Sequence, residues 1–155
     1  MVNVVRRNAR AILIDGDDLV LIKRTKPGRE PYWVTVGGGV DPEDPSVEDA
    51  LRREVFEELG GNAVDPVQVY VLTEPKDDGI VVQHFFLCRL HGMDLSRRTG
   101  AEFGRPERGG YEVVRVPFTR EGIRGIDLMP PELADYLAAN AEGLLSLFNT
   151  RVTRS

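Results

Sequence analysis

The stretch from Ser46 to Gly61 constrains the fold more than any other part of the sequence, because it predicts a helix with both ends marked. Ser46 can cap the amino-terminal end, and Asp49 makes a weak capping box three residues later. Gly60 and Gly61 supply a stop, since glycine readily adopts the left-handed conformation that ends many helices. We therefore expect a helix over about residues 46–59.

Three carboxylates of this helix stand beside its apolar face. At about 100° per residue, the apolar stripe consists of Val47, Leu51, Val55 and Leu59. Glu54, Glu57 and Glu58 fall along one flank of that stripe, whereas Phe56 points toward solvent. Carboxylates at the margin of a core need compensation from an arginine or a cation. A solvated face is the ordinary alternative, but the helix also follows a glycine run at 37–39, and the combination is more specific than either feature alone.

The acidity of the chain is concentrated in front of and within this helix. Between residues 41 and 58 there are eight acids against two arginines, a net charge of −6 in a chain whose total is −5. Such a cluster repels phosphates unless a cation lies between them. Grouped oxygen ligands suit Mg²⁺ or Mn²⁺. With two histidines and one cysteine in the whole chain, we expect no structural zinc site.

Composition and length predict one soluble domain over residues 1–155. Hydrophobic residues make up 41% and charged residues 29% of the chain, as in ordinary globular proteins. No apolar run approaches the roughly 20 residues that a membrane helix needs. Cys88 is the only cysteine, which excludes an internal disulfide and favours a reducing, cytoplasmic setting.

The rest of the sequence predicts strands on both sides of the marked helix. We expect strands at 10–15, 19–24, 32–36, 67–72, 79–90 and 111–118, and a final helix from about residue 130. The segment 79–90 is apolar on both faces, so we place it centrally in its sheet. Residues 93–110 form a long polar connection. This order predicts an α/β fold in which helices cover the faces of a sheet.

The helix and the glycine run together resemble the signature of the Nudix hydrolases. That signature reads Gly, five residues, Glu, seven residues, then Arg-Glu, aliphatic, any, Glu-Glu, any, Gly, aliphatic. Residues 53–60 match its second half up to the last position, where Gly61 stands in place of the aliphatic residue. Starting from Gly38 puts Asp44 at the first Glu position and leaves eight residues before Arg53, a one-residue insertion. Starting from Gly39 puts Pro45 there, which cannot act as a carboxylate, so we prefer Gly38.

The resemblance implies an α/β/α sandwich with a mixed sheet and a loop–helix–loop box. It implies divalent-metal-dependent hydrolysis of a diphosphate linkage in a nucleoside diphosphate joined to another moiety, with Mg²⁺ or Mn²⁺ as cofactor. The implied metal ligands are Gly38, Glu54, Glu57 and Glu58. The implied catalytic residues are Arg53, Glu54, Glu57 and a downstream carboxylate, for which Glu112 is the first choice and Glu107 the second. We expect Arg53 to pair with Asp44 and to orient the glutamates, and we leave the general base open.

Three further residues are candidates for substrate binding. Arg24 follows a strand, Arg98 lies in the long polar connection, and Trp33 could stack on a base or belong to the core. We expect a small nucleotide as partner, no membrane and no nucleic acid, and we leave a homodimer open. Two alternatives stand beside the hydrolase. One is a catalytically weak Nudix-like domain that senses a nucleotide or ADP-ribose. The other is an acidic helix for protein contact, which does not explain the glycine run.

Overall fold

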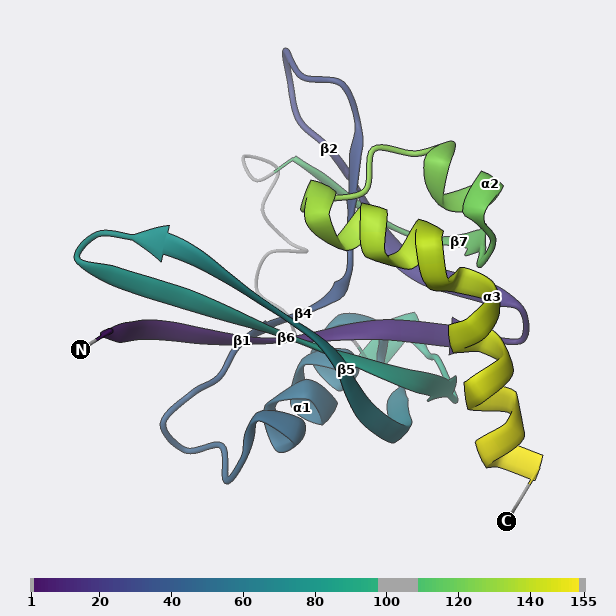
Figure 1. Cartoon of the computed structure of the whole chain (residues 1–155), viewed down its shortest axis with the longest axis horizontal. Coiled ribbons are helices and arrows are strands. Elements are labelled where there is room, and N and C mark those ends of the chain that lie inside the picture. Colours follow the sequence, from purple (N-terminus) through teal and green to yellow (C-terminus); the bar gives the residue numbers. More distant parts are fainter. Residues whose placement is uncertain (1, 98–108, 154–155) are drawn as a thin grey trace. The chain divides into compact units, whose positions relative to one another are not determined.

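Figure 1 shows the computed structural model, which describes residues 2–97 and 109–153. The chain forms two compact units, each made of two segments. The first unit contains Met1–Leu13 and Val36–Thr99, and the second contains Ile14–Thr35 and Gly100–Ser155. In the described part of the chain, no helix is both long and apolar enough to span a membrane.

The first unit carries the marked helix and most of the long strands. Its elements are β1 (Val4–Asp15, whose last two residues belong to the second unit), β4 (Val36–Gly39), α1 (Val47–Leu59), β5 (Asn62–Lys76), β6 (Gly79–His91) and the short 3-10 helix η1 (Leu95–Arg97). The strand order β1-β6-β5 places β6 in the middle, as its apolar faces predicted. Strand β4 pairs antiparallel with β1, with Asn8 opposite Gly39.

Strands β5 and β6 form one long antiparallel hairpin. Their pairing runs from Asn62–His91 to Lys76–Gly79, so β5 is much longer than the predicted segment 67–72. Residues 73–76, predicted as part of the connection, continue the ladder and leave a tight turn in which Asp77 has a positive φ of 53°. Aspartate tolerates this conformation better than most residues.

The second unit is built around β2 (Asp18–Thr25). This strand pairs antiparallel with β3 (Tyr32–Val34) and with β7 (Gly110–Pro117). Two helices follow, α2 (Arg120–Arg124) and α3 (Pro131–Thr153), and α2 packs against α3. The buried face of α3 includes Leu133, Leu137, Ala141, Leu144 and Phe148. The sequence reading missed α2, a helix of five residues that Thr119 caps.

The predicted strand at 32–36 is wrong as a single element. Residues 32–34 pair with β2, whereas residues 36–39 pair with β1. The chain changes its hydrogen-bonding partner at Thr35, a buried residue between the two short strands. An apolar run shows that a segment is extended, but it does not show which strand accepts its hydrogen bonds.

Local signals place the ends of α1 as predicted. Ser46 has extended backbone angles, and its hydroxyl accepts a hydrogen bond from the amide of Asp49 at 3.0 Å. Gly60 ends the helix in the left-handed conformation, and its N–H donates to the carbonyl of Phe56. Ala50, Leu51, Val55 and Leu59 are buried, while Phe56 is 39% exposed. These contacts fix which face of α1 carries the carboxylates.

Replacing the cap tests this anchoring. Ser46→Ala removes the acceptor for the Asp49 amide, so we expect the free energy of unfolding to fall by about 1 kcal/mol. Ser46→Asp keeps an acceptor and should stay close to the wild type. Urea unfolding followed by circular dichroism measures both variants. Equal midpoints for Ser46→Ala and the wild type would show that the cap does not stabilise α1.

Candidate functional site

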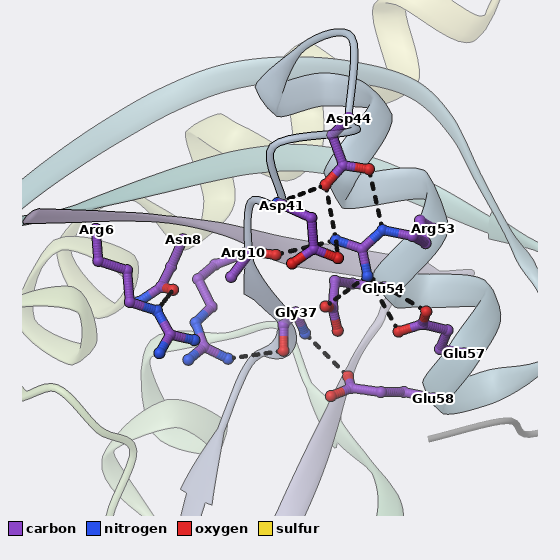
Figure 2. A network of polar contacts seen from close by, with 11 residues as sticks. Arg6, Asn8, Arg10, Gly37, Asp41, Asp44, Arg53, Glu54, Glu57 and Glu58 are labelled. Atoms are coloured by element: carbon purple, nitrogen blue, oxygen red, sulfur yellow. Dashed lines mark hydrogen bonds and ion pairs between the residues drawn. The ribbon is translucent and has the colours of Figure 1, made fainter. Parts of the chain in front are cut away.

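The guanidinium group of Arg53 joins the carboxylates in front of α1 to those on it (Figure 2). Its Nε and Nη2 donate to the two oxygens of Asp44 at 3.0 and 2.8 Å. Its Nη1 donates to Glu54 at 3.0 Å and to Glu57 at 3.2 Å. Its Nη2 also donates to the carbonyl of Gly39 at 3.0 Å. One planar fork therefore orients three acids and the end of β4.

The two-pronged contact with Asp44 confirms the predicted partner of Arg53 and the choice of Gly38 as the start of the motif. The Asp44 carboxylate is only 9% exposed. Its hydrogen bond to Arg53 is the main reason that its pKa lies below the usual range. The same bond is the main reason that the pKa of Arg53 is raised. Both groups are thus held in their charged forms.

A turn in the loop before α1 accommodates the extra residue. The amide of Asp41 donates to the Asp44 carboxylate at 2.8 Å, and the amide of Asp44 donates to the carbonyl of Asp41 at 3.0 Å. This turn brings Asp44 to the guanidinium, although its side chain is one methylene shorter than glutamate. Asp41 itself approaches Arg53 at 3.4 Å. Asp41 was not predicted as a site residue, because its approach to Arg53 depends on the shape of the turn.

The glycines of β4 let two helix carboxylates reach the strand backbone. A Cβ atom on Gly38 would lie 2.7 Å from the Glu54 carboxylate, so only glycine leaves that space to Glu54. The amide of Gly37 donates to Glu58 at 2.9 Å. The residues brought together in the first unit are therefore Gly38, Arg53, Glu54, Glu57 and Glu58.

The charge of this cluster is only partly compensated. Glu54 is the most enclosed of the motif glutamates that contact Arg53, with 14% of its side chain exposed against 33% for Glu57. Burial, and then the negative charge of Glu57, raise the pKa of Glu54, while Arg53 and Arg10 act against this shift. A cation beside Glu54 would relieve both effects.

The donor chemistry fits Mg²⁺ or Mn²⁺, but the ligands are not preassembled. In residues 2–97 and 109–153, no group of three His, Cys, Asp or Glu side chains is placed so that it could hold an ion. Glu54 and Glu57 point to Arg53, and Glu58 accepts from the Gly37 amide. Binding an ion between them therefore requires these carboxylates to come closer together.

Other predicted residues lie on neighbouring strands of the second unit. Lys23 of β2 stands opposite both Trp33 and Glu112, and its ammonium lies 5.5 Å from the centre of the Trp33 ring. Arg24 stacks on Tyr111 at 3.7 Å. Glu112 is exposed. Arg98 and Glu107 were also predicted, and they lie outside the described residues.

Arg10 is a neighbour of the cluster that the sequence reading missed. Its Nη1 donates to the carbonyl of Gly37 at 3.1 Å, and it interacts electrostatically with Glu58 and Glu54. Burial lowers the pKa of Arg10. The available signal was the alternation of Arg6, Asn8 and Arg10 directly before the apolar part of β1.

Comparison with known proteins agrees with this geometry. The family model of the NUDIX domain matches residues 4–138, so this chain belongs to the Nudix family, and the predicted resemblance is confirmed. A Bacillus subtilis (strain 168) protein named "Putative 8-oxo-dGTP diphosphatase" is 32% identical over 101 residues, which cover 63% of this chain. The match spans 64% of that relative, slightly less than two thirds of its length.

Solved structures show the same fold at low identity. A NUDIX hydrolase from Nitrosomonas europaea superimposes with a TM-score of 0.67 at 17% identity, covering 89% of this chain and 88% of the other. The ORF135 protein of E. coli gives a TM-score of 0.62 at 23% identity, covering 94% and 92%. The predicted α/β fold with a mixed sheet is therefore confirmed.

Two neighbouring glycines of β4 should respond differently to substitution. Gly37 has a φ of 148°, and a Cβ there would collide with the backbone carbonyl of Ala9. We expect Gly37→Ala to lower the free energy of unfolding by at least about 2 kcal/mol. Gly38→Ala meets only the far end of the Glu54 side chain, so its free energy of unfolding should lie within about 1 kcal/mol of the wild-type value.

Gly143→Ala is the matched control, because nothing lies within 4 Å of its added methyl group. It should be neutral or slightly stabilising on the exposed side of α3. Denaturant unfolding compares the three variants. A Gly37→Ala protein as stable as Gly143→Ala would contradict the described packing of β4 on β1.

Proposed function

We propose that this protein is a divalent-metal-dependent Nudix hydrolase that cleaves a diphosphate linkage in a nucleoside diphosphate joined to another moiety. The observation that carries the proposal is the contact of one guanidinium, Arg53, with Asp44, Glu54 and Glu57 beside the glycine strand. Such an arrangement concentrates oxygen ligands at one edge of α1. Family membership supports the same reaction class.

The residues have separate roles in this proposal. Glu54, Glu57, Glu58 and the carbonyl of Gly38 would hold Mg²⁺ or Mn²⁺. Such an ion lowers the pKa of bound water and neutralises charge on phosphoryl oxygens. Arg53 orients Glu54 and Glu57, and Asp44 holds Arg53. Either of those glutamates would accept the proton of the attacking water, and Glu112 stays a predicted downstream carboxylate.

The substrate is proposed at the level of its class. The name of the Bacillus subtilis relative makes 8-oxo-dGTP the first compound to test. Arg24, Arg98 and Trp33 remain proposed substrate contacts, with Arg24 already stacked on Tyr111. We further propose that residues 1–155 act as one Nudix domain in the cytoplasm, which suits the free, buried thiol of Cys88.

One observation favours the sensor as a second candidate. The carboxylates of α1 are engaged by Arg53 and Gly37, and no preassembled ion-binding group occurs among the described residues. A protein that only binds a nucleotide would not need to bring these carboxylates together around an ion. The two functions differ in whether turnover follows binding.

A substrate screen with a matched pair of variants distinguishes the hydrolase from the sensor. Nucleoside di- and triphosphates including 8-oxo-dGTP, dinucleoside polyphosphates, ADP-ribose and nucleotide sugars are offered with Mg²⁺ or Mn²⁺. We expect one of these classes to be hydrolysed, with oxygen from labelled water in a phosphate product. Glu57→Gln should lower the rate at least about a hundredfold, the scale of losing a general base.

Glu43→Gln is the control, since Glu43 is exposed in the loop before α1 and should leave the rate unchanged. Ligand binding measured without metal should be similar in both variants. If one compound binds tightly but no compound is hydrolysed with either metal, the protein is a sensor and not a hydrolase.

A further inference from the structure

A row of alternating cations and aromatic rings crosses one end of the strands in the second unit. Arg24 of β2 stands directly opposite Tyr32 of β3 and also directly opposite Tyr111 of β7. Residues that stand opposite each other share one face of a sheet, so these three side chains lie in one line across three strands. Arg29, in the connection between β2 and β3, lies over the Tyr32 ring and extends the line. We call Arg29, Tyr32, Arg24 and Tyr111 the Arg–Tyr row.

The sequence of the connection fixes the turn that carries Arg29. The amide of Arg29 donates to the carbonyl of Lys26 at 3.3 Å, across Pro27 and Gly28. Gly28 has a φ of 75°, and a proline followed by a glycine of positive φ is typical of a type II turn. Both Lys26 and Arg29 are exposed, and a Cβ on Gly28 would meet nothing within 4 Å. The turn therefore presents its cations to solvent.

Stacking on tyrosine holds the guanidinium planes of the row. The Cζ atom of Arg29 lies 3.9 Å from the centre of the Tyr32 ring, and that of Arg24 lies 3.7 Å from the centre of the Tyr111 ring. At such distances a guanidinium lies over the face of the ring. The Nε of Arg24 also donates to the carbonyl of Gly110 at 3.3 Å. Because Arg29 is exposed, the side of its plane turned away from Tyr32 is a platform on which a planar ligand can stack.

The positive charge of the turn is available to a ligand. Residues 23–29 contain four cations and no acid, in a chain whose net charge is −5. Among the described residues, the charged groups of Lys26 and Arg29 lie near a tyrosine ring and form no ion pair. A cation–π contact leaves the charge in place. Of the neighbouring acids, Glu30 is exposed, and Glu112 belongs to the opposite face of β7.

We propose that the Arg–Tyr row and the turn beside it bind a single-stranded nucleic acid. The ammonium of Lys26 and the N–H groups of Arg29 contact successive phosphates, and a base stacks on the Arg29 plane. An acidic peptide matches the charge but not the flat platform, since carboxylates approach a guanidinium in its plane. This partner differs from the expectation drawn from the sequence, because only strand pairing brings the cations beside the tyrosines.

The first test measures binding and its salt dependence. A labelled ten-residue oligo(dT) is titrated with the full-length protein and followed by fluorescence anisotropy, with EDTA present so that no metal-dependent reaction occurs. Each phosphate contact adds about 0.7 to the slope of log affinity against log salt. Lys26→Gln and Arg29→Gln should therefore each lower that slope by about 0.7 and weaken binding about tenfold near about 30 mM salt. Arg24 is left unchanged, because it is also a proposed substrate contact.

Arg120→Gln is the matched control, since it removes one exposed arginine of the same unit. Arg120 begins α2, beyond the end of the β2–β7 ladder at which Asp18 pairs with Pro117. The turn lies beyond the other end, at which Thr25 pairs with Gly110. This variant should keep the affinity and the salt slope of the wild type. Equal effects of Arg120→Gln and Arg29→Gln would show that only net charge matters and would overturn the proposal.

The second test separates stacking from charge. An abasic strand of ten deoxyribose phosphates carries the same charge without bases, so the wild type should bind it at least about fivefold more weakly than oligo(dT). Arg29→Lys keeps the charge but not the plane. It should keep the salt slope and lose most of the preference for oligo(dT) over the abasic strand.

Three results of these titrations would overturn the proposal. They are no anisotropy change with the wild type, equal affinity for oligo(dT) and the abasic strand, and displacement of oligo(dT) by polyglutamate as effectively as by unlabelled oligo(dT). The last result would identify an acidic peptide as the partner. None of these measurements depends on turnover, so failure of the proposed hydrolase leaves this test intact.

Discussion

The contact of Arg53 with three carboxylates is the interaction on which the site depends. Without this guanidinium, the carboxylates of Asp44, Glu54 and Glu57 would repel one another across a short distance. Burial already disfavours the charged form of Glu54 and raises its pKa. The planar guanidinium satisfies all three and also binds the carbonyl of Gly39. It therefore ties the loop, the helix and strand β4 together. A lysine could not make these parallel contacts, because its ammonium is a compact point charge.

The three glycines at residues 37–39 of β4 have an equally direct consequence. Carboxylates of α1 approach the strand at Gly37 and Gly38, and arginines of β1 approach it at Gly37 and Gly39. Negative and positive clusters are thus separated by the thickness of one backbone. The two clusters are electrostatically coupled, since Arg10 interacts with Glu58 and Glu54.

The sequence predicted those features that depend on neighbouring residues. The ends of α1 follow from Ser46 and Gly60, and the pairing of Asp44 with Arg53 follows from the motif. The sequence did not predict the division of residues 32–39 between two partners, because pairing is decided by distant strands. It also missed Arg6 and Arg10, because β1 begins with four exposed residues and its start relies on distant contacts such as the hydrogen bond from the Ile80 amide to the Asn3 carbonyl.

We propose the acidic cluster beside β4 as a divalent-cation site, and a titration with Mn²⁺ tests this proposal. Free Mn²⁺ is followed by electron paramagnetic resonance while the protein is titrated. We expect Mn²⁺ to bind to the wild type and to Glu48→Gln, since the Glu48 carboxylate pairs with Arg52 on the outer side of α1. We expect at least about tenfold weaker binding by Glu58→Gln. Equal Mn²⁺ affinity in all three proteins would contradict the proposal.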